Sequence, residues 1–327
     1  MLVDRYNRKI NYLRISVTDR CNLRCIYCMP KEGIPKLSHK EILRYEELLK
    51  IVRVAVQKGI SKFRITGGEP LIRKDVIHFI QQLANIPGVR DISLTTNGVL
   101  LYQMAEELYN AGIHGINVSM DTLDPTKYMR ITGRDYFNHV WRGIEHAEQI
   151  GFFPIKLNVV VMRGLNDDEI LDFAKLTLDK PYHIRFIEFM PIGPEGVRHT
   201  ERFISGPEIK SRIQALRKLI PVKSQSFDGP ARRFKFRFAK GEIGFISPLS
   251  HPFCSSCNRL RLTADGKLRG CLFSDEGIDI KTSLRNGCSH EELGDLLISA
   301  ITHKPKGHHF GEETFKRCAS PMIRIGG

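Results

Sequence analysis

Short β-branched segments alternate with helical patterns from residue 12 to about residue 190, and this alternation restricts the fold more than any other feature. Strands separated by helical stretches form βαβ units, which place their strands parallel in one sheet. The strand starts lie on average about 34 residues apart, close to the roughly 30 residues of one such unit. The predicted strands are 12–18, 62–66, 91–95, 115–119, 154–161 and 183–189. We therefore expect an α/β fold with a mostly parallel sheet.

Polar side chains share one face of most of these strands, because successive side chains of a strand point to opposite faces. Arg14, Arg64 and Lys156 lie on that face, and the other face carries Leu, Ile and Val. A closed eight-stranded barrel or a doubly wound sheet would bury these cations among apolar side chains, at a high cost. A barrel with fewer strands, open on one side and holding an anionic ligand, avoids that cost. The alternative is that the cations lie at strand ends or pair with Asp121 and Glu188.

Capping patterns predict where two helices begin. Ser38 with Glu41 forms a capping box that predicts a helix after the first strand, and Gly59 is expected to end it. Ser289 with Glu292 predicts a second helix near the end of the chain.

The sequence changes character after residue 190, where Pro and Gly become frequent. Two segments alternate apolar and polar residues, one around Lys240-Gly241 and one around Asp265-Gly266, which predicts two antiparallel hairpins. We therefore place a domain boundary near residue 220. It separates a barrel domain, 1–220, from a smaller C-terminal domain of antiparallel hairpins and helices, 221–327.

Six of the eight cysteines form two groups of three. The first group follows the first predicted strand and comprises Cys21, Cys25 and Cys28. Closely spaced thiolates bind iron–sulfur clusters. Because a structural zinc ion needs four ligands, three thiolates indicate either a cluster with one open iron or a zinc site that a distant histidine such as His39 completes.

The second group comprises Cys254, Cys257 and Cys271. A zinc ribbon of three cysteines and His251 is one interpretation of this group. Arg259 and Arg261 follow it and point to the same side of one predicted strand. Two guanidinium groups beside a metal centre favour an anionic ligand over a purely structural zinc ion.

Further motifs make a family resemblance specific. The first cysteine group reads CNLRCIYC, and Gly67-Gly68-Glu69-Pro70 follows the second strand. Later segments read LTTNG, NVSMDTL, FIEFMP and CSSCNRLRLTADGKLRGCLF, and the chain ends in Gly326-Gly327. This combination resembles MoaA-type GTP 3′,8-cyclases, radical S-adenosylmethionine (SAM) enzymes of molybdenum cofactor biosynthesis. The resemblance covers essentially the whole chain and implies an incomplete (β/α)6 TIM-like barrel with a smaller C-terminal domain.

The resemblance also implies a reaction. Both cysteine groups would hold [4Fe–4S] clusters, the first binding SAM and the second binding the purine of GTP. A 5′-deoxyadenosyl radical would remove the ribose 3′ hydrogen before C3′ bonds to C8, giving (8S)-3′,8-cyclo-7,8-dihydroguanosine 5′-triphosphate. This product of the first step of the pathway would pass to cyclic pyranopterin monophosphate synthase. Flavodoxin or ferredoxin would supply electrons, and the family leads us to expect a homodimer.

The resemblance also implies roles for single residues at the positions that match the family's motifs. The six grouped cysteines would be cluster ligands. The implied SAM contacts are Tyr27, Gly68, Ser119 and Met190. The implied GTP contacts are Arg14, Arg64, Thr95, Lys156, Arg259, Leu260 and Arg261. The implied catalytic residues are Arg14, Arg259, Arg261, Gly326 and Gly327. For the two terminal glycines, a frayed tail is the alternative.

Charge leaves rival functions open. Lys and Arg number 50 against 36 Asp and Glu, a formal net charge of +14, so an anionic partner is expected. The rivals are a zinc-ribbon nucleic-acid-binding protein and a radical SAM enzyme that modifies a peptide. Clustered cysteines favour a reducing compartment, and the sequence shows neither an apolar run of about 18 residues nor a secretory signal. We therefore expect a cytoplasmic enzyme that binds neither nucleic acid nor membrane.

Three remaining features are assigned no functional role. Cys288 and Cys318 are predicted to be free thiols, and His308 with His309 to lie in a solvated loop. Four basic residues are predicted to form the solvated face of the first hairpin: Arg232, Arg233, Lys235 and Arg237.

Overall fold

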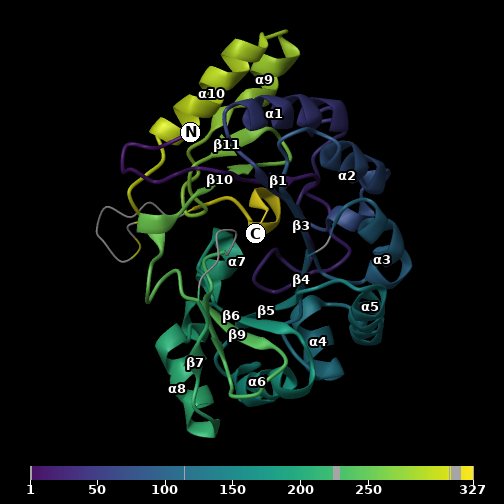
Figure 1. The fold of residues 1–327 in the computed structure, drawn as a ribbon, viewed down its shortest axis with the longest axis vertical. Helices are drawn as coiled ribbons and strands as arrows, with labels where there is room; N and C mark the ends of the chain where they lie inside the picture. Colours follow the sequence, from purple (N-terminus) through teal and green to yellow (C-terminus); the bar gives the residue numbers. More distant parts are fainter. Residues whose placement is uncertain (1, 114, 224–228, 309, 311–317, 327) are drawn as a thin grey trace.

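The strands of the chain form one sheet that curves into an open barrel, with helices outside it (Figure 1). This computed structural model describes residues 2–113, 115–223, 229–308, 310 and 318–326. All six predicted strands are present, with ends that differ from the predicted ones by at most two residues. They are β1 (Tyr12–Ser16), β2 (Lys62–Thr66), β3 (Asp91–Thr96), β4 (Gly115–Ser119), β5 (Ile155–Val161) and β6 (His183–Glu188).

Parallel pairing extends beyond these six strands. In the described part of the chain, the order β10-β1-β2-β3-β4-β5-β6-β9 is parallel throughout. β10 (Arg259–Leu262) pairs with β1, and β9 (Glu242–Ile246) pairs with β6. No described ladder joins β9 to β10, so the barrel remains open. The incomplete (β/α)6 barrel is therefore confirmed, with one added strand at each edge.

Both predicted hairpins are present, and each contributes one of these edge strands. β8 (Arg232–Lys235) runs antiparallel to β9, and β11 (Lys267–Arg269) runs antiparallel to β10. β7 (Ile220–Pro221) and β12 (Ile278–Asp279) are the outermost strands. The C-terminal third of the chain therefore contacts both edges of the barrel, as the positions of β9 and β10 in Figure 1 show.

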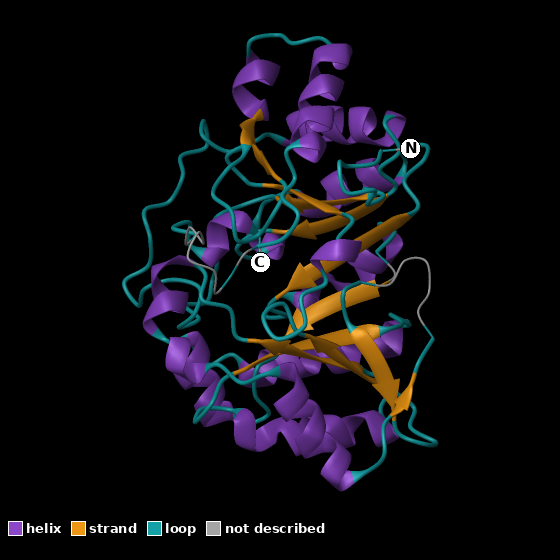
Figure 2. Cartoon of the chain, turned by 90° about the vertical axis from the view of Figure 1, so that its left-hand side faces the viewer, coloured by secondary structure: helices purple, strands orange, loops and turns teal. Residues whose placement is uncertain are grey.

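Helices flank the strands (Figure 2). In the described chain, no helix is both long and apolar enough to cross a membrane. The α-helices are α1 (Tyr45–Gln57), α2 (Val76–Ala84), α3 (Leu101–Asn110), α4 (Pro125–Thr132), α5 (Phe137–Ile150), α6 (Ile170–Asp179), α7 (Gly193–Arg198), α8 (Gly206–Leu216), α9 (Ile280–Arg285), α10 (His290–Thr302) and α11 (Met322–Ile325). The 3₁₀ helices are η1 (Pro70–Ile72), η2 (Asp167–Glu169), η3 (Thr200–Arg202) and η4 (Cys254–Ser256).

The two capping predictions have different outcomes. Ser289 caps α10 through the predicted box with Glu292. In the first case the backbone N–H of Ser38 does donate to Glu41 (2.8 Å), yet the helix begins only at Tyr45. The N-cap of α1 is Arg44, whose backbone N–H donates to Glu47 (2.6 Å). The reason for the later start is tertiary, because the Glu47 carboxylate also accepts from Arg285 of α9.

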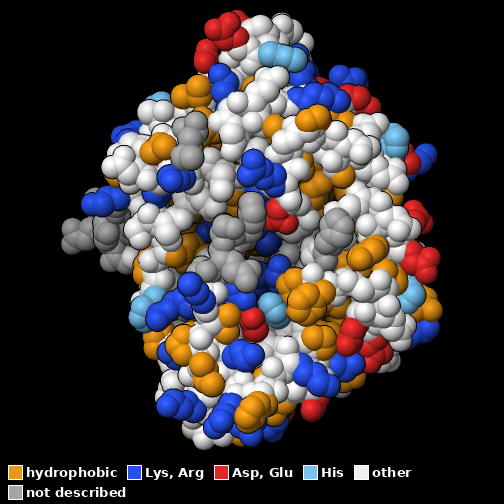
Figure 3. All heavy atoms as spheres, in the orientation of Figure 1, with side chains coloured by type: hydrophobic (Ala, Val, Ile, Leu, Met, Phe, Trp, Pro, Cys, Tyr) orange, Lys and Arg blue, Asp and Glu red, His pale blue; other side chains and the backbone are white. Residues whose placement is uncertain are grey.

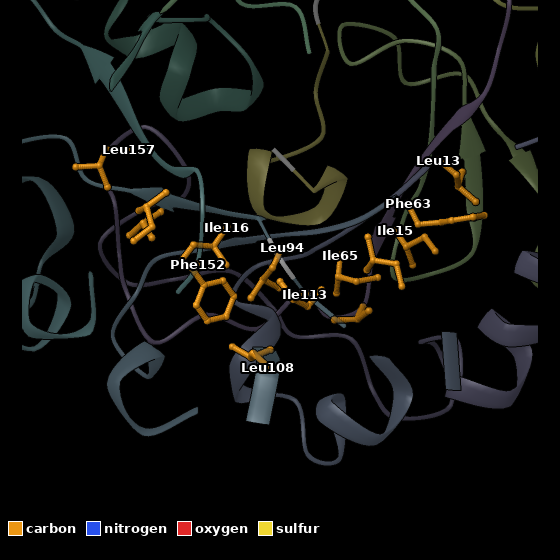
Figure 4. Packing of buried hydrophobic residues seen from close by; sticks show 14 of the residues in the cluster. Leu13, Ile15, Phe63, Ile65, Leu94, Leu108, Ile113, Ile116, Phe152 and Leu157 are labelled. Carbon is orange, nitrogen blue, oxygen red and sulfur yellow. The ribbon is translucent and has the colours of Figure 1, made fainter. Parts of the chain in front are cut away.

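The apolar face of the strands packs against the helices, as the alternation of side chains predicts. Leu13, Ile15, Phe63, Ile65 and Leu94 have no exposed surface. Figure 4 shows these side chains between the strands and the helices, on the side of the sheet opposite the C-terminal helix α11. Each such aliphatic side chain stabilises the fold by about 1.5–3 kcal/mol. The polar face is thereby left free for the interior of the barrel.

Candidate functional site

One cavity opens on the inner face of the barrel, and residues from both ends of the chain line it. Lys and Arg side chains surround the hollow at the middle of the face shown in Figure 3. All six grouped cysteines line the cavity: Cys21, Cys25, Cys28, Cys254, Cys257 and Cys271. The two groups, which are more than 200 residues apart in sequence, therefore share one site.

The loop that carries the first cysteine group is held by the Gly67-Gly68 turn after β2. The backbone N–H of Gly68 donates to the carbonyl of Thr18 (2.7 Å), and that of Glu69 donates to the carbonyl of Arg20 (2.8 Å). A Cβ atom on Gly68 would lie 2.2 Å from the same Arg20 oxygen, so only glycine fits. The glycines of this motif therefore allow the β2 loop to pack directly beside the cysteines.

Glu69 links this turn to the loop after β3. Its buried carboxylate accepts from the backbone N–H of Asn97 (2.6 Å) and from the hydroxyl of Thr96 (2.8 Å). Burial raises the pKa of Glu69 to about 7 despite these hydrogen bonds. Asn97 in turn donates to Asn22, next to the first cysteine (2.7 Å). Three consecutive strand ends are thus tied together around the first cysteine group.

The residues implied to contact SAM come together at the same end of the barrel. Tyr27, Gly68, Ser119 and Met190 all line the cavity. The Tyr27 hydroxyl donates to Asp121 (2.7 Å), which also accepts from the backbone N–H of Val160 (2.8 Å). Burial raises the pKa of Asp121 to about 6. This interaction fixes the cysteine loop against β4 and β5.

The thiols of the first cysteine group are buried and lose their protons less readily than free cysteine. Burial raises the pKa of Cys21 to about 11, and burial and neighbouring thiolates also raise those of Cys25 and Cys28. Iron must therefore displace the thiol protons when it binds. Among the described residues, no three His, Cys, Asp or Glu side chains are placed to share a single metal ion. A four-iron cluster does not need three ligands around one metal ion, because each thiolate binds a different iron.

The second cysteine group lies in a more positive environment. Burial would raise the pKa of Cys257, but Arg259 and Lys304 outweigh it and lower that pKa to about 6. The Lys304 ammonium lies 3.4 Å from the Cys257 sulfur. Cys257 is therefore prepared to bind metal as a thiolate, whereas burial raises the pKa of Cys254.

Arginines form a row across the inner face of three strands. The strand register places Arg14 beside Arg261 on one side and beside Arg64 on the other. Arg14 and Arg261 are only 9% and 6% exposed. Burial and neighbouring arginines lower the pKa of Arg14, and they lower that of Arg261 to about 10. A polyanionic ligand would relieve this repulsion.

Unsatisfied polar atoms lie near this row. Thr95 Oγ1 and Asn158 Oδ1 are buried and have no hydrogen-bond partner within the described structure. Both residues line the cavity. Buried polar atoms without partners are uncommon and often belong to ligand sites. They indicate that a polar ligand completes the hydrogen bonding here.

Two of the predicted GTP contacts do not line the cavity. Leu260 is fully buried in the core, because it alternates with Arg259 and Arg261 along β10, so only its backbone can reach a ligand. Lys156 lies on the inner face of β5 outside the cavity lining. Burial and Arg185, followed by Arg64, lower the pKa of Lys156 to about 7.

Four cations that the sequence did not single out line the cavity: Arg8, Arg185, Lys304 and Lys306. Arg185 lies on β6 and donates to Asn117 of β4 (3.1 Å), and the alternation used for the other strands would have identified it. Arg8 and Lys304 lie outside periodic strand segments, so no local pattern indicates them.

The C-terminal residues lie inside the barrel. α11 is surrounded by the strand ends in Figure 1, and Met322 and Ile323 line the cavity. Arg261 donates to the carbonyl of Gly326 (3.0 Å), which has a φ of +65°. A Cβ atom on Gly326 would lie 2.9 Å from the Thr66 side chain. Gly327 lies outside the described residues.

The remaining sequence features lie at the edge of the site or away from it. His308 was wrongly expected in a solvated loop, because it is half-buried, contacts the Pro248 carbonyl (2.7 Å) and packs on Phe273. His309 lies outside the described residues. Cys288 and Cys318 are free thiols, as predicted, and neither lines the cavity. Of the basic hairpin residues, Arg232, Lys235 and Arg237 are exposed and Arg233 pairs with Glu242 (2.7 Å).

Comparison with known families divides the chain into two adjoining parts. The Radical SAM superfamily matches residues 15–177, and the Molybdenum Cofactor Synthesis C family matches residues 182–310. The first match contains the first cysteine group and the second contains the other group.

Curated relatives match over the full length. A GTP 3′,8-cyclase of Thermodesulfovibrio yellowstonii is 54% identical over 326 residues, 99% of each chain. Those of Moorella thermoacetica and Desulforamulus reducens are 50% and 47% identical, covering 99% and 100% of each chain respectively.

Among solved structures, Streptococcus suis SuiB bound to its precursor peptide SuiA superposes with a TM-score of 0.61 at 13% identity. The match covers 98% of this chain and 70% of that one. At this identity the likeness concerns the fold alone. The close relatives are GTP 3′,8-cyclases, and they match both parts of the chain that carry the cysteine groups. The chain belongs to the GTP 3′,8-cyclase family of radical SAM enzymes.

Proposed function

We propose that this protein converts GTP to (8S)-3′,8-cyclo-7,8-dihydroguanosine 5′-triphosphate, the first step of molybdenum cofactor biosynthesis. The observation that carries the proposal is the shared cavity, where two groups of three cysteines flank a row of buried arginines. One group suits a SAM-binding cluster, and the arginines suit a triphosphate. The names of relatives that are 47–54% identical support the same substrate.

Membership in the radical SAM superfamily implies a [4Fe–4S] cluster and SAM. Cys21, Cys25 and Cys28 would hold that cluster, with Tyr27, Gly68, Ser119 and Met190 around SAM. When bound and reduced, this cluster and SAM supply the 5′-deoxyadenosyl radical that takes the 3′ hydrogen of GTP. The Gly67-Gly68 turn and the Tyr27–Asp121 hydrogen bond keep the cysteine loop in place for this chemistry.

A second [4Fe–4S] cluster, held by Cys254, Cys257 and Cys271, is part of the proposal. Three observations support it. The second group has three thiolates like the first, it lines the same cavity, and nearby cations lower the pKa of Cys257 to about 6. Three protein ligands leave one iron open, where the purine of GTP would bind.

The protein's cations would then orient GTP between the two groups. Arg14, Arg64 and Lys156 would bind the triphosphate, with Thr95 as a hydrogen-bond partner. Arg259 and Arg261 would stand beside the reacting nucleoside, and the contact of Arg261 with the Gly326 carbonyl would hold its guanidinium in place. Gly327, which lies outside the described residues, would complete the site. Leu260 would contribute only its backbone.

We further infer the wider setting of the enzyme from the family. Residues 1–220 would form the SAM-binding unit and 221–327 the unit that binds the second cluster. The product would pass to cyclic pyranopterin monophosphate synthase, and a flavodoxin or ferredoxin would deliver electrons to a homodimer. Eight free cysteines support a reducing, cytoplasmic location.

The two rival functions have weaker support. A peptide-modifying radical SAM enzyme rests on a likeness at 13% identity, which concerns the fold alone. A zinc ribbon that binds nucleic acid does not account for the match of residues 15–177 to the Radical SAM superfamily.

The test is an anaerobic assay of the protein reconstituted with iron and sulfide, supplied with reductant, SAM and GTP. We expect 5′-deoxyadenosine and a cyclised nucleotide to form together, and mass spectrometry measures both. Formation of 5′-deoxyadenosine with GTP unchanged would leave the radical SAM assignment intact and contradict the substrate. A colourless protein without iron would contradict both.

A further inference from the structure

We propose that Lys304 is a positioning residue that donates a hydrogen bond to the Cys257 thiolate and raises the reduction potential of the second cluster. This inference rests on the second cluster of the proposed function. It concerns a residue outside the cysteine motif, in the turn that follows α10.

The Lys304 ammonium reaches both arms of the hairpin that carries the second cysteine group. Its Nζ lies 3.4 Å from the Cys257 sulfur, 3.0 Å from the carbonyl oxygen of Arg259 and 2.5 Å from that of Gly270. Gly270 immediately precedes Cys271. A single ammonium, with its three donors, therefore connects the segments of two of the three cysteines.

A second cation holds the adjoining backbone in place. Arg8 donates to the carbonyl of Cys254 (2.8 Å) and to those of Pro305 (2.7 Å) and Lys306 (3.2 Å). The third cysteine is thereby tied to the same turn that carries Lys304. Asp4 pairs with the Arg8 guanidinium, so the charge of Arg8 is compensated. Two cations face the Cys257 sulfur, Arg259 and Lys304, and Lys304 is the lysine among them.

The Lys304 ammonium is buried beside the thiolates, so its charge acts on a bound cluster and not on the protein surface. Lys304 is only 3% exposed, whereas lysines are almost always exposed unless they are paired. A buried ammonium near thiolates stabilises negative charge there. Reduction adds one negative charge to a cluster, so this ammonium stabilises the reduced form and raises the potential. Removing it should shift the potential to a more negative value.

The experiment uses the full chain with Cys21→Ala, Cys25→Ala and Cys28→Ala, which leaves the second cysteine group and the two isolated thiols Cys288 and Cys318. The protein is labelled with ¹⁵N-lysine and reconstituted anaerobically. Iron and sulfide analysis then reports on the second cluster itself. Pulsed EPR of the reduced cluster reports on a coupled lysine nitrogen, and a redox titration gives the potential.

We expect a ¹⁵N coupling that disappears in Lys304→Met, together with a more negative potential. Lys306→Met is the matched control, because it removes the same charge from an exposed side chain two residues away, and it should retain the coupling. Lys304→Arg should restore most of the potential, because it keeps the charge.

Three results separate the possible failures. If the triple variant binds no four-iron cluster, the proposed second cluster is wrong, and the role of Lys304 fails with it. If the cluster forms without a lysine coupling, or if Lys304→Met keeps the parent potential, only the role of Lys304 is wrong. If Lys304→Met does not retain its cluster, the ¹⁵N-lysine coupling in the labelled parent protein and in the labelled holoenzyme tests the hydrogen bond. Absence of that coupling in both would show that the role of Lys304 is wrong.

Discussion

Lys156 allows a quantitative test of whether the cationic inner face exists to bind an anion rather than to stabilise the fold. Burial and Arg185, followed by Arg64, lower its pKa from 10.5 to about 7. At about 1.4 kcal/mol for each tenfold change, folding disfavours the charged amine by about 5 kcal/mol. The nearby Asp91 forms its ion pair with Lys62 (2.9 Å), so the amine of Lys156 is poorly compensated.

This cost depends on pH. The unfolded chain keeps the Lys156 proton up to about pH 10.5, whereas the folded protein loses it near pH 7. Between these values the unfolded state binds more protons, so stability rises with pH. The cost is therefore about 4 kcal/mol at pH 7 and about 2 kcal/mol at pH 9. We expect Lys156→Met to raise the free energy of unfolding without GTP by up to these amounts.

Urea unfolding at pH 7 and pH 9 measures this gain. Lys240→Met, at an exposed position, is the control and should leave the urea midpoint unchanged. The same Lys156→Met variant should gain less stability from added GTP than the parent does, because it has lost a cation. A variant that is less stable than the parent at pH 7, or a gain that is the same at both pH values, would show that the charge of Lys156 does not destabilise the fold.

Three other substitutions test separate parts of the site. Gly68→Ala places a Cβ atom 2.2 Å from the Arg20 carbonyl oxygen. It should therefore destabilise the protein by about 1–3 kcal/mol and reduce the amount of iron bound after reconstitution. An unchanged melting temperature would count against the close packing of this turn. Gly326→Ala should slow GTP conversion at least about tenfold, because it is crowded and has a positive φ, whereas Gly287→Ala, with a positive φ in open space, should not. Arg259→Ala should reduce GTP conversion by about 10- to 100-fold while SAM is still cleaved without product, and equal loss of both activities would contradict its assignment to the substrate.

The barrel could be predicted from the sequence because the patterns that indicate its strands lie within short segments. β-branched segments at regular spacing gave the six strands, and the alternation within each strand separated Arg14, Arg64 and Thr95 from the core. The same reasoning, continued along β6, would have added Arg185. These features depend on a period of two residues, which a single sequence displays directly.

Features that depend on contacts between residues far apart in sequence could not be predicted from the sequence. β9 and β10 pair with β6 and β1, and nothing within the hairpins indicates which barrel edge each one joins. The start of α1 shifted for the same reason, since Glu47 is held by Arg285, 238 residues away. Arg8 and Lys304 reach the second cysteine group from turns and loops without any periodic pattern. The cysteine motifs, by contrast, could be recognised from the sequence because the cysteines of each group lie within a short segment of the chain.

In the proposed reaction, the radical formed at the first cysteine group takes the 3′ hydrogen of GTP held beside the second group. Turnover of GTP that carries deuterium at C3′ follows this hydrogen atom. We expect 5′-deoxyadenosine to carry the deuterium and the cyclised product to have lost it. Unlabelled 5′-deoxyadenosine, formed alongside a product that retains deuterium, would contradict the proposed reaction.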